Sequence, residues 1–120
     1  MGSEFARARE NLKIKLKQNA DKTVNEVLNA DLKGLAEIGL FGSLVRNDFN
    51  CRSDSDIYLL FHDNIPDRQT KGYLRSVAEE KNCDLVFLTK SDFYGDTGNL
   101  LSESILKNRM VIWREDADDS

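Results

Sequence analysis

The chain has 120 residues, of which 40% are hydrophobic and 32% charged, and a formal net charge of −4 at pH 7. This length is typical of one domain, and the composition excludes a low-complexity or disordered chain. No apolar run approaches the roughly 20 residues that span a bilayer, and the N-terminal segment does not resemble a signal peptide. We therefore expect a cytoplasmic domain that makes no contact with a membrane.

The two ends of the chain are interpreted separately from the domain. Residues 1–5 resemble the product of two adjacent cloning sites, and we interpret them as a cloning scar. Residues 6–114 are predicted to form a single domain, and residues 115–120 an acidic tail. The N-terminal stretch is basic and is expected to form a solvated helix face. Its basic residues are Arg7, Arg9, Lys13, Lys15 and Lys17.

Cysteine and histidine are scarce in this sequence. Cys51 and Cys83 form no CxxC pair, so we expect two reduced thiols rather than a disulfide framework. His62 is the only histidine, which excludes mechanisms that need a histidine cluster and most zinc sites.

The first predicted element is a long helix over residues 7–32, because apolar residues recur there at three- and four-residue spacing. Gly34 stands where a helix stop is expected. A short apolar run over residues 35–41 predicts a buried strand that ends at Gly42-Ser43. A polar, turn-rich connection then leads to residues 56–61, the most strand-like segment of the chain.

The second half of the chain continues the alternation. Pro66 stands where a helix could begin, and residues 83–88 are predicted to form a third strand. Ser91 or Thr97 is expected to open the last helices, and residues 110–113 are predicted to form an edge strand. Two sets of apolar residues have helical spacing: Tyr73, Leu74, Val77 and Ala78, and then Leu100, Leu101, Ile105 and Leu106. The element order predicts an α/β (α+β) fold with a small mixed sheet of about four strands flanked by helices.

Two acids mark the start of the second predicted strand. Side chains alternate along a strand, so Asp54 and Asp56 are expected on one face, about 7 Å apart, with Ser55 on the other. Two carboxylates this close repel each other and need a partner. Mg²⁺ commonly binds one or two carboxylates together with substrate phosphates. A pair of such metals can clamp the attacking and leaving oxygens of a phosphoryl displacement.

The turn before this strand is suited to phosphate. Gly42 lets the backbone approach a ligand closely, and the Ser43 hydroxyl with the following N–H groups can hold phosphate oxygens. Arg46 can meet the same phosphates with its guanidinium. Asp84 opens the next strand and is assigned by position as a third carboxylate, either a metal ligand or the base that accepts a proton. A solvated acid remains the alternative for Asp84.

These residues resemble a known family. Gly42-Ser43, ten residues, and then Asp54-Ser55-Asp56 match the GS-x10-DxD signature of the minimal nucleotidyltransferases (MNT), a group of the DNA polymerase beta-like nucleotidyltransferase superfamily. Arg46 matches the arginine of that group's Gly-Ser-x-x-Arg turn, whereas Asn47 stands where a glycine often follows. The resemblance covers roughly residues 35–113.

The resemblance implies a function as well as a fold. It implies Mg²⁺-dependent transfer of a nucleoside monophosphate, most commonly AMP from ATP, and often an antitoxin role beside a HEPN-type toxin. The expected catalytic and metal-binding residues are Asp54, Asp56 and Asp84, and the expected nucleotide-binding residues are Gly42, Ser43 and Arg46.

A second reading comes from the small size of the chain. Little sequence remains for an acceptor-binding domain, so a protein partner, a second subunit or a nucleic acid is expected to supply the acceptor. The alternative function is a weak or inactive binding module that neutralises its partner by direct association. A docking role for Lys13, Lys15 and Lys17 is a further hypothesis. A calcium loop is excluded, because Leu59 replaces the required glycine and Ile65 the required glutamate.

Overall fold

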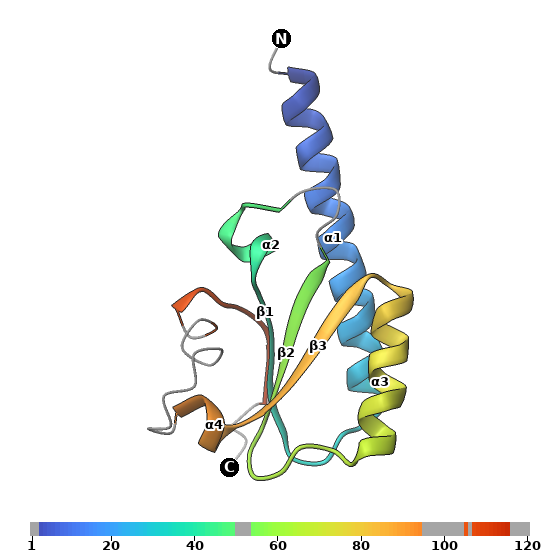
Figure 1. The fold of residues 1–120 in the computed structure, drawn as a ribbon, viewed down its shortest axis with the longest axis vertical. Coiled ribbons are helices and arrows are strands. Elements are labelled where there is room, and N and C mark those ends of the chain that lie inside the picture. The colour runs from blue at the N-terminus through green and yellow to red at the C-terminus, as the bar shows by residue number, and fades with distance from the viewer. Residues whose placement is uncertain (1–2, 50–53, 95–104, 106, 116–120) are drawn as a thin grey trace.

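The computed structural model describes residues 3–49, 54–94, 105 and 107–115. Figure 1 shows the elements in chain order. They are α1 (Ser3–Asn29), β1 (Leu35–Phe41), α2 (Ser43–Arg46), β2 (Ser55–Phe61), α3 (Arg68–Glu80), β3 (Cys83–Thr89), α4 (Lys90–Tyr94) and β4 (Met110–Arg114). The predicted mixed fold with a four-stranded sheet is confirmed, and the short helix α2 is added to the predicted order.

The sheet has the strand order β3-β2-β1-β4. β1 runs antiparallel to both β2 and β4, whereas β2 and β3 are parallel and joined through α3. A parallel pair needs such a crossover connection. β4 is an edge strand, as predicted, and pairs with β1.

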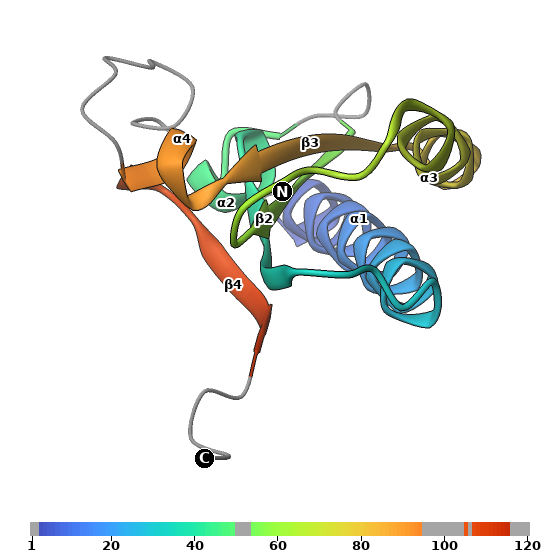
Figure 2. The ribbon, with the colours of Figure 1, turned by 90° about the horizontal axis from the view of Figure 1, so that it is seen from below.

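The two faces of the sheet are covered differently. α1 and α3 pack against one face (Figure 2), and the main core lies beneath them. The other face carries a smaller buried cluster, which comprises Tyr58, Leu60, Leu88 and Ile105. Side chains alternate along β2, so Ser55 and Ile57 belong to the helix-covered face, and Asp56 and Tyr58 to the other. Asp56, the second acid of the motif, therefore lies on the face opposite α1.

A buried polar network lies on this second face. Glu37, only 4% exposed, accepts a 2.6 Å hydrogen bond from the Tyr58 hydroxyl. Arg114 donates to the other carboxylate oxygen at 2.9 Å, and Arg109 lies 3.3 Å from Glu37. Burial, followed by the hydrogen bond to Glu37, raises the pKa of Tyr58 above its ordinary value. The network ties β4 and the residue before it to the middle of the sheet.

Several predicted boundaries differ from the observed ones. α1 begins at Ser3, inside the segment interpreted as a cloning scar, and ends at Asn29 rather than residue 32. The helix stops early because Asp31, with φ of 51°, already adopts the left-handed conformation that was expected only at Gly34. α3 begins at Arg68 rather than Pro66, because the Asp67 side chain caps it by accepting from the Thr70 N–H at 2.8 Å.

The predicted core needs one correction. Leu74 and Ala78 are buried on α3, but Tyr73 is 61% exposed and points away from the core. Cys83 is a free, buried thiol, and Cys51 lies outside the described residues. Thr97, Leu100, Leu101 and Leu106 also lie outside them. Over the described ranges, no helix is both long and apolar enough to cross a membrane.

Candidate active site

Three chain segments meet at one end of the sheet. The end of β1, the start of β2 and the start of β3 coincide there, because β1 is antiparallel to β2, and β2 is parallel to β3. Asp56 lies opposite Phe41 on one side and Asp84 on the other. The structure therefore brings together the two acids that the sequence placed on neighbouring strands.

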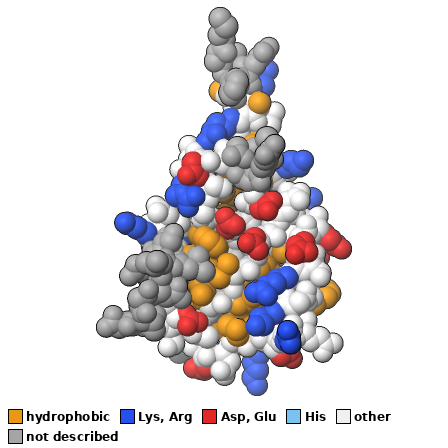
Figure 3. Space-filling model, viewed as in Figure 1, with side chains coloured by type: hydrophobic (Ala, Val, Ile, Leu, Met, Phe, Trp, Pro, Cys, Tyr) orange, Lys and Arg blue, Asp and Glu red, His pale blue; other side chains and the backbone are white. Residues whose placement is uncertain are grey.

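The electrostatics of Asp56 reflect this meeting. The pKa of Asp56 is raised from 3.8 to about 6, chiefly by burial and in addition by the negative charges of Asp84 and Asp54. Arg46 opposes the shift through its positive charge. Three of the predicted site residues, Asp84, Asp54 and Arg46, are thus close enough to act on the Asp56 carboxylate. Figure 3 shows acidic side chains gathered on this face, near the end where α1 projects.

The backbone of Gly42 lies close to the Asp56 side chain. Its φ of 80° favours glycine, and a Cβ atom at this position would lie 2.2 Å from Asp56 Oδ2. A side chain here would collide with the carboxylate and strain the backbone. The glycine therefore lets the turn after β1 pass directly over the acid, as the sequence predicted for a close approach.

Ser43 and Arg46 are the first and last residues of α2. Gly42 occupies the position before the helix and makes no side-chain capping bond. Ser43 is partly exposed, and its carbonyl accepts from the Asp48 N–H at 3.0 Å. Arg46 Nε donates a 3.1 Å hydrogen bond to Asp48 Oδ2. In this state Asp48 therefore holds the guanidinium that was predicted to meet phosphate.

Asn47 explains one departure from the family pattern. It adopts a left-handed conformation, with φ of 66°, directly after α2. Glycine is favoured in that conformation, and asparagine is one of the few other residues that tolerate it. The substitution for glycine therefore keeps the same turn.

Polar contacts on the helix-covered face fix the strand that carries the acids. Ser55, fully buried between Asp54 and Asp56 in sequence, donates a 2.7 Å hydrogen bond to the Leu16 carbonyl of α1. Thr23, on the same helix, donates to Cys83 Sγ at 3.2 Å. Sequence reasoning missed these contacts. A serine on the apolar face of a strand is the signal that could have found the first, because a buried hydroxyl needs a partner.

Arg9 fixes the segment that follows α2. Its guanidinium donates to the Phe49 carbonyl at 3.2 Å and also to the Asn47 carbonyl, and it lies 4.3 Å from the centre of the Phe49 ring. The sequence predicted only a solvated basic residue here. α1 therefore contacts both the loop after α2 and the start of β2.

The carboxylates at this end of the sheet are the candidate ligands for a metal ion. Within residues 3–49, 54–94, 105 and 107–115, no group of three or more His, Cys, Asp or Glu residues is assembled to hold a metal ion. Mg²⁺, however, usually takes one or two carboxylates and completes its shell with water and substrate phosphates. Asp54 and Asp56, whose mutual repulsion a cation would relieve, fit such a shared site better than an all-protein cage.

A surface cavity lies at the other end of the sheet. A cavity of about 650 Å³ is lined by residues 30–34 and 63–67 and by Thr70. These residues surround the start of β1 and the end of β2, which is the opposite end of the sheet from Asp56. The cavity is therefore separate from the place where the carboxylates meet.

Comparison with known families identifies the domain. The sequence model described as polymerase beta nucleotidyltransferase matches residues 22–118. The chain belongs to the polymerase beta nucleotidyltransferase family. The match includes the turn after β1 and all three acids. No curated protein shows significant sequence similarity to the chain.

Solved structures share the fold of this nucleotidyltransferase domain. A proposed nucleotidyltransferase from Sulfolobus solfataricus is 21% identical, with a TM-score of 0.57, over 89% of this chain and 87% of that one. A toxin–antitoxin complex with AMP-PNP is 20% identical, with a TM-score of 0.58, over 82% and 76%. A tri-AMPylated Shewanella oneidensis HEPN toxin in complex with an MNT antitoxin is 20% identical, with a TM-score of 0.55, over 87% of this chain and 76% of that one. The domain is thus similar in fold to antitoxins of MNT–HEPN pairs.

Proposed function

We propose that this domain is a Mg²⁺-dependent nucleotidyltransferase that transfers AMP from ATP to a protein acceptor. The observation that supports the proposal is the pairing of Asp56 with Asp84 at one end of the sheet, with Asp56 close to the Gly42 turn and within reach of the Asp54 charge. A site with clustered carboxylates and a close backbone turn suits a nucleoside triphosphate and its metal.

Each residue has a distinct role in this proposal. Asp54 and Asp56 bind the divalent cation, which neutralises charge on the phosphates when bound. The N–H groups at the start of α2 and the Ser43 hydroxyl bind phosphate oxygens. Arg46 exchanges its exposed partner Asp48 for the triphosphate, since ion pairs between exposed side chains are weak, about 0–1 kcal/mol.

The reaction is a displacement at the α-phosphorus of ATP. An acceptor hydroxyl oxygen forms the new bond to the α-phosphorus, the bond to the β-phosphate oxygen breaks, and pyrophosphate leaves. The hydroxyl proton passes to a carboxylate. Asp84 is the proposed base, because it is exposed beside Asp56 and can face an incoming acceptor. Asp56 is then free to remain a metal ligand.

The proposed acceptor is a HEPN-type toxin, which the domain would neutralise as an antitoxin. The support is similarity of fold to the MNT antitoxin in complex with a tri-AMPylated HEPN toxin.

Calorimetry with ATP, CTP, GTP and UTP, with and without Mg²⁺, tests the nucleotide site. We expect Mg²⁺-dependent binding that is strongest for ATP and is lost in the Asp54→Asn/Asp56→Asn variant. The matched control is Asp31→Asn/Asp63→Asn, which removes two exposed charges at the opposite end of the sheet. Binding that survives in the first variant, or disappears in the control, would contradict the assignment.

Transfer is measured separately from binding. Incubation of a purified HEPN-type partner with α-labelled ATP is expected to label the partner in the wild type and not in the Asp54→Asn/Asp56→Asn variant. An unlabelled partner that nevertheless binds tightly would favour the alternative, a module that neutralises its partner by association alone.

A further inference from the structure

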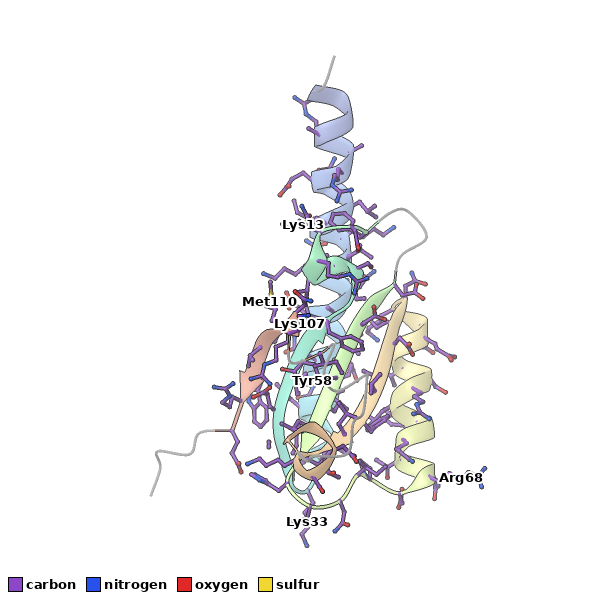
Figure 4. All side chains as sticks on the ribbon, turned by 60° about the vertical axis from the view of Figure 1, so that its left-hand side comes forward. Lys13, Lys33, Tyr58, Arg68, Lys107 and Met110 are labelled. Atoms are coloured by element: carbon purple, nitrogen blue, oxygen red, sulfur yellow. The ribbon has the colours of Figure 1, made fainter. Side chains whose placement is uncertain are left out.

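The N-terminal half of α1 extends beyond the sheet. Figures 1 and 4 show its first turns projecting from the body, with Lys13 near the point where the helix leaves it. The molecule measures 52 × 30 × 30 Å as a result. Residues 6–18, here called the basic arm, contain five basic side chains and one acidic side chain, in a chain whose net charge is −4.

Only the C-terminal part of the basic arm packs on the core, through Leu16 and the partly buried Leu12. The first fully buried side chain of α1 is Leu16, and the basic residues of the arm are exposed. A helix of fewer than about 12 residues is marginal in water without packing. Arg9 is the basic residue of the arm that contacts the body, through the carbonyls of Asn47 and Phe49. Among the described residues, the side chains of Lys13, Ile14, Lys15 and Lys17 are exposed.

The position of the basic arm relates it to the candidate active site. Arg9 contacts the segment that follows α2, and the Leu16 carbonyl accepts the hydrogen bond from Ser55, between the two acids of the motif. The arm therefore projects from the end of the sheet at which Asp54, Asp56 and Asp84 meet. A macromolecule bound along the arm would lie beside the site where transfer is proposed.

The chemistry of the arm favours a protein over a nucleic acid. Ile14 is 47% exposed. It lies on the same helix face as Arg7, seven residues earlier, and Lys17, three residues later. A phosphate backbone is bound through charge alone and gains little from an exposed isoleucine. Protein interfaces combine an apolar centre with a charged rim.

We propose that the basic arm is the docking surface for an acidic, partly apolar surface of the acceptor protein. This rests on the proposed function, because it names how that acceptor reaches the site. Ile14 forms the apolar centre of the contact, and Lys13, Lys15 and Lys17 supply the charges that attract and orient the partner.

The test compares two charge-reversal variants for binding to a purified HEPN-type partner. The arm variant is Lys13→Glu/Lys15→Glu/Lys17→Glu. The control variant, Lys33→Glu/Arg68→Glu/Lys71→Glu, makes the same change of charge at the opposite end of the sheet. We expect the arm variant to weaken partner binding by about tenfold or more and to lose its salt dependence. Its Mg²⁺-dependent binding of ATP should remain that of the wild type. Equal affinity of the two variants would overturn the proposal.

A second variant separates a protein partner from other occupants. Ile14→Gln keeps every charge, so it should weaken binding of the partner while leaving the salt dependence in place. The proposal would be overturned if the arm bound a single-stranded RNA oligonucleotide more tightly than the partner and Ile14→Gln left that RNA binding unchanged. So would a wild-type dimer that the arm variant converts to a monomer. ATP binding without any partner binding would also overturn it, yet leave the nucleotide site of the proposed function intact.

Discussion

The Ser55 hydroxyl donates a 2.7 Å hydrogen bond to the main-chain carbonyl of Leu16, 39 residues earlier in the chain. Ser55 is fully buried, and its neighbours in sequence are the two acids of the motif. The bond therefore joins α1 to the first residue of β2 on the face opposite Asp56. Because side chains of a strand alternate, a shift of Ser55 would move both acids.

Replacement of Ser55 by alanine should impair nucleotide binding more than it impairs the fold. Loss of one buried hydrogen bond costs about 1 kcal/mol of unfolding free energy, which a small domain can tolerate. The acids would lose their anchor to α1, so we expect weaker Mg²⁺-dependent ATP binding by calorimetry. Ser76→Ala, an exposed change on α3, is the control. Loss of stability without any change in Mg²⁺-dependent binding would reduce Ser55 to a purely structural residue.

Asp56 makes the stability of the metal-free protein depend on pH. Its pKa is raised to about 6 from 3.8, so the native state opposes its ionisation. The contribution of Asp56 to stability is therefore fully present below about pH 3.8 and is lost as the pH rises through about 6. Asp56→Asn removes this dependence, and we expect the variant to be the more stable protein at neutral pH when a chelator is present.

Urea unfolding in EDTA, from about pH 4 to about pH 8, measures this effect. The stability difference between Asp56→Asn and wild type should grow in favour of the variant as the pH rises. Asp63→Asn, at an exposed acid beyond the far end of β2, should show no such trend. A difference that stays constant across the range would mean that neither burial nor the neighbouring carboxylates oppose the ionisation of Asp56.

Gly42→Ala should disrupt the site directly. The new Cβ would lie 2.2 Å from Asp56 Oδ2, and alanine is strained at a φ of 80°. We expect a loss of about 1–2 kcal/mol in unfolding free energy and no measurable ATP binding. The control is Gly72→Ala on α3, where a Cβ meets nothing within 4 Å and should stabilise the helix by about 0.5–1 kcal/mol. Equal stability of the two variants would contradict the close approach at Gly42.

The strands and their order could be predicted from the sequence because their signals are local. Compact apolar runs mark β1, β2 and β3, and the Gly-Ser turn with the two acids indicated the candidate site residues, whereas the register of the strands is seen only in the structure. Asp84 was assigned as a third carboxylate by position alone, and its pairing with Asp56 is seen only in the structure.

The features that escaped prediction depend on contacts between distant segments. The bond between Ser55 and Leu16, and the contact of Arg9 with Phe49, join residues about 40 apart. No pattern in a single segment indicates such a bond. Tyr73 was predicted to be buried from helical spacing alone, but α3 packs through a narrower stripe than that spacing allows. Local periodicity indicates that a face exists, and packing decides how wide it is.

The buried network at the centre of the sheet yields a final prediction. The Tyr58 hydroxyl donates to Glu37 at 2.6 Å, and Arg114 and Arg109 complete the surroundings of that carboxylate. Tyr58→Phe removes a hydrogen bond to a charged group, which costs about 1.5–3 kcal/mol, and urea unfolding should show a loss of that order. Tyr73→Phe removes the same hydroxyl from a side chain 61% exposed, so it should change nothing. A double-mutant cycle with Glu37→Gln tests the pairing itself, because residues in contact give a coupling of about 0.5–3 kcal/mol. The Tyr58 ring also packs against Gly39, where an added Cβ would collide with it. Purely additive effects would show that this packing, and not Glu37, holds Tyr58.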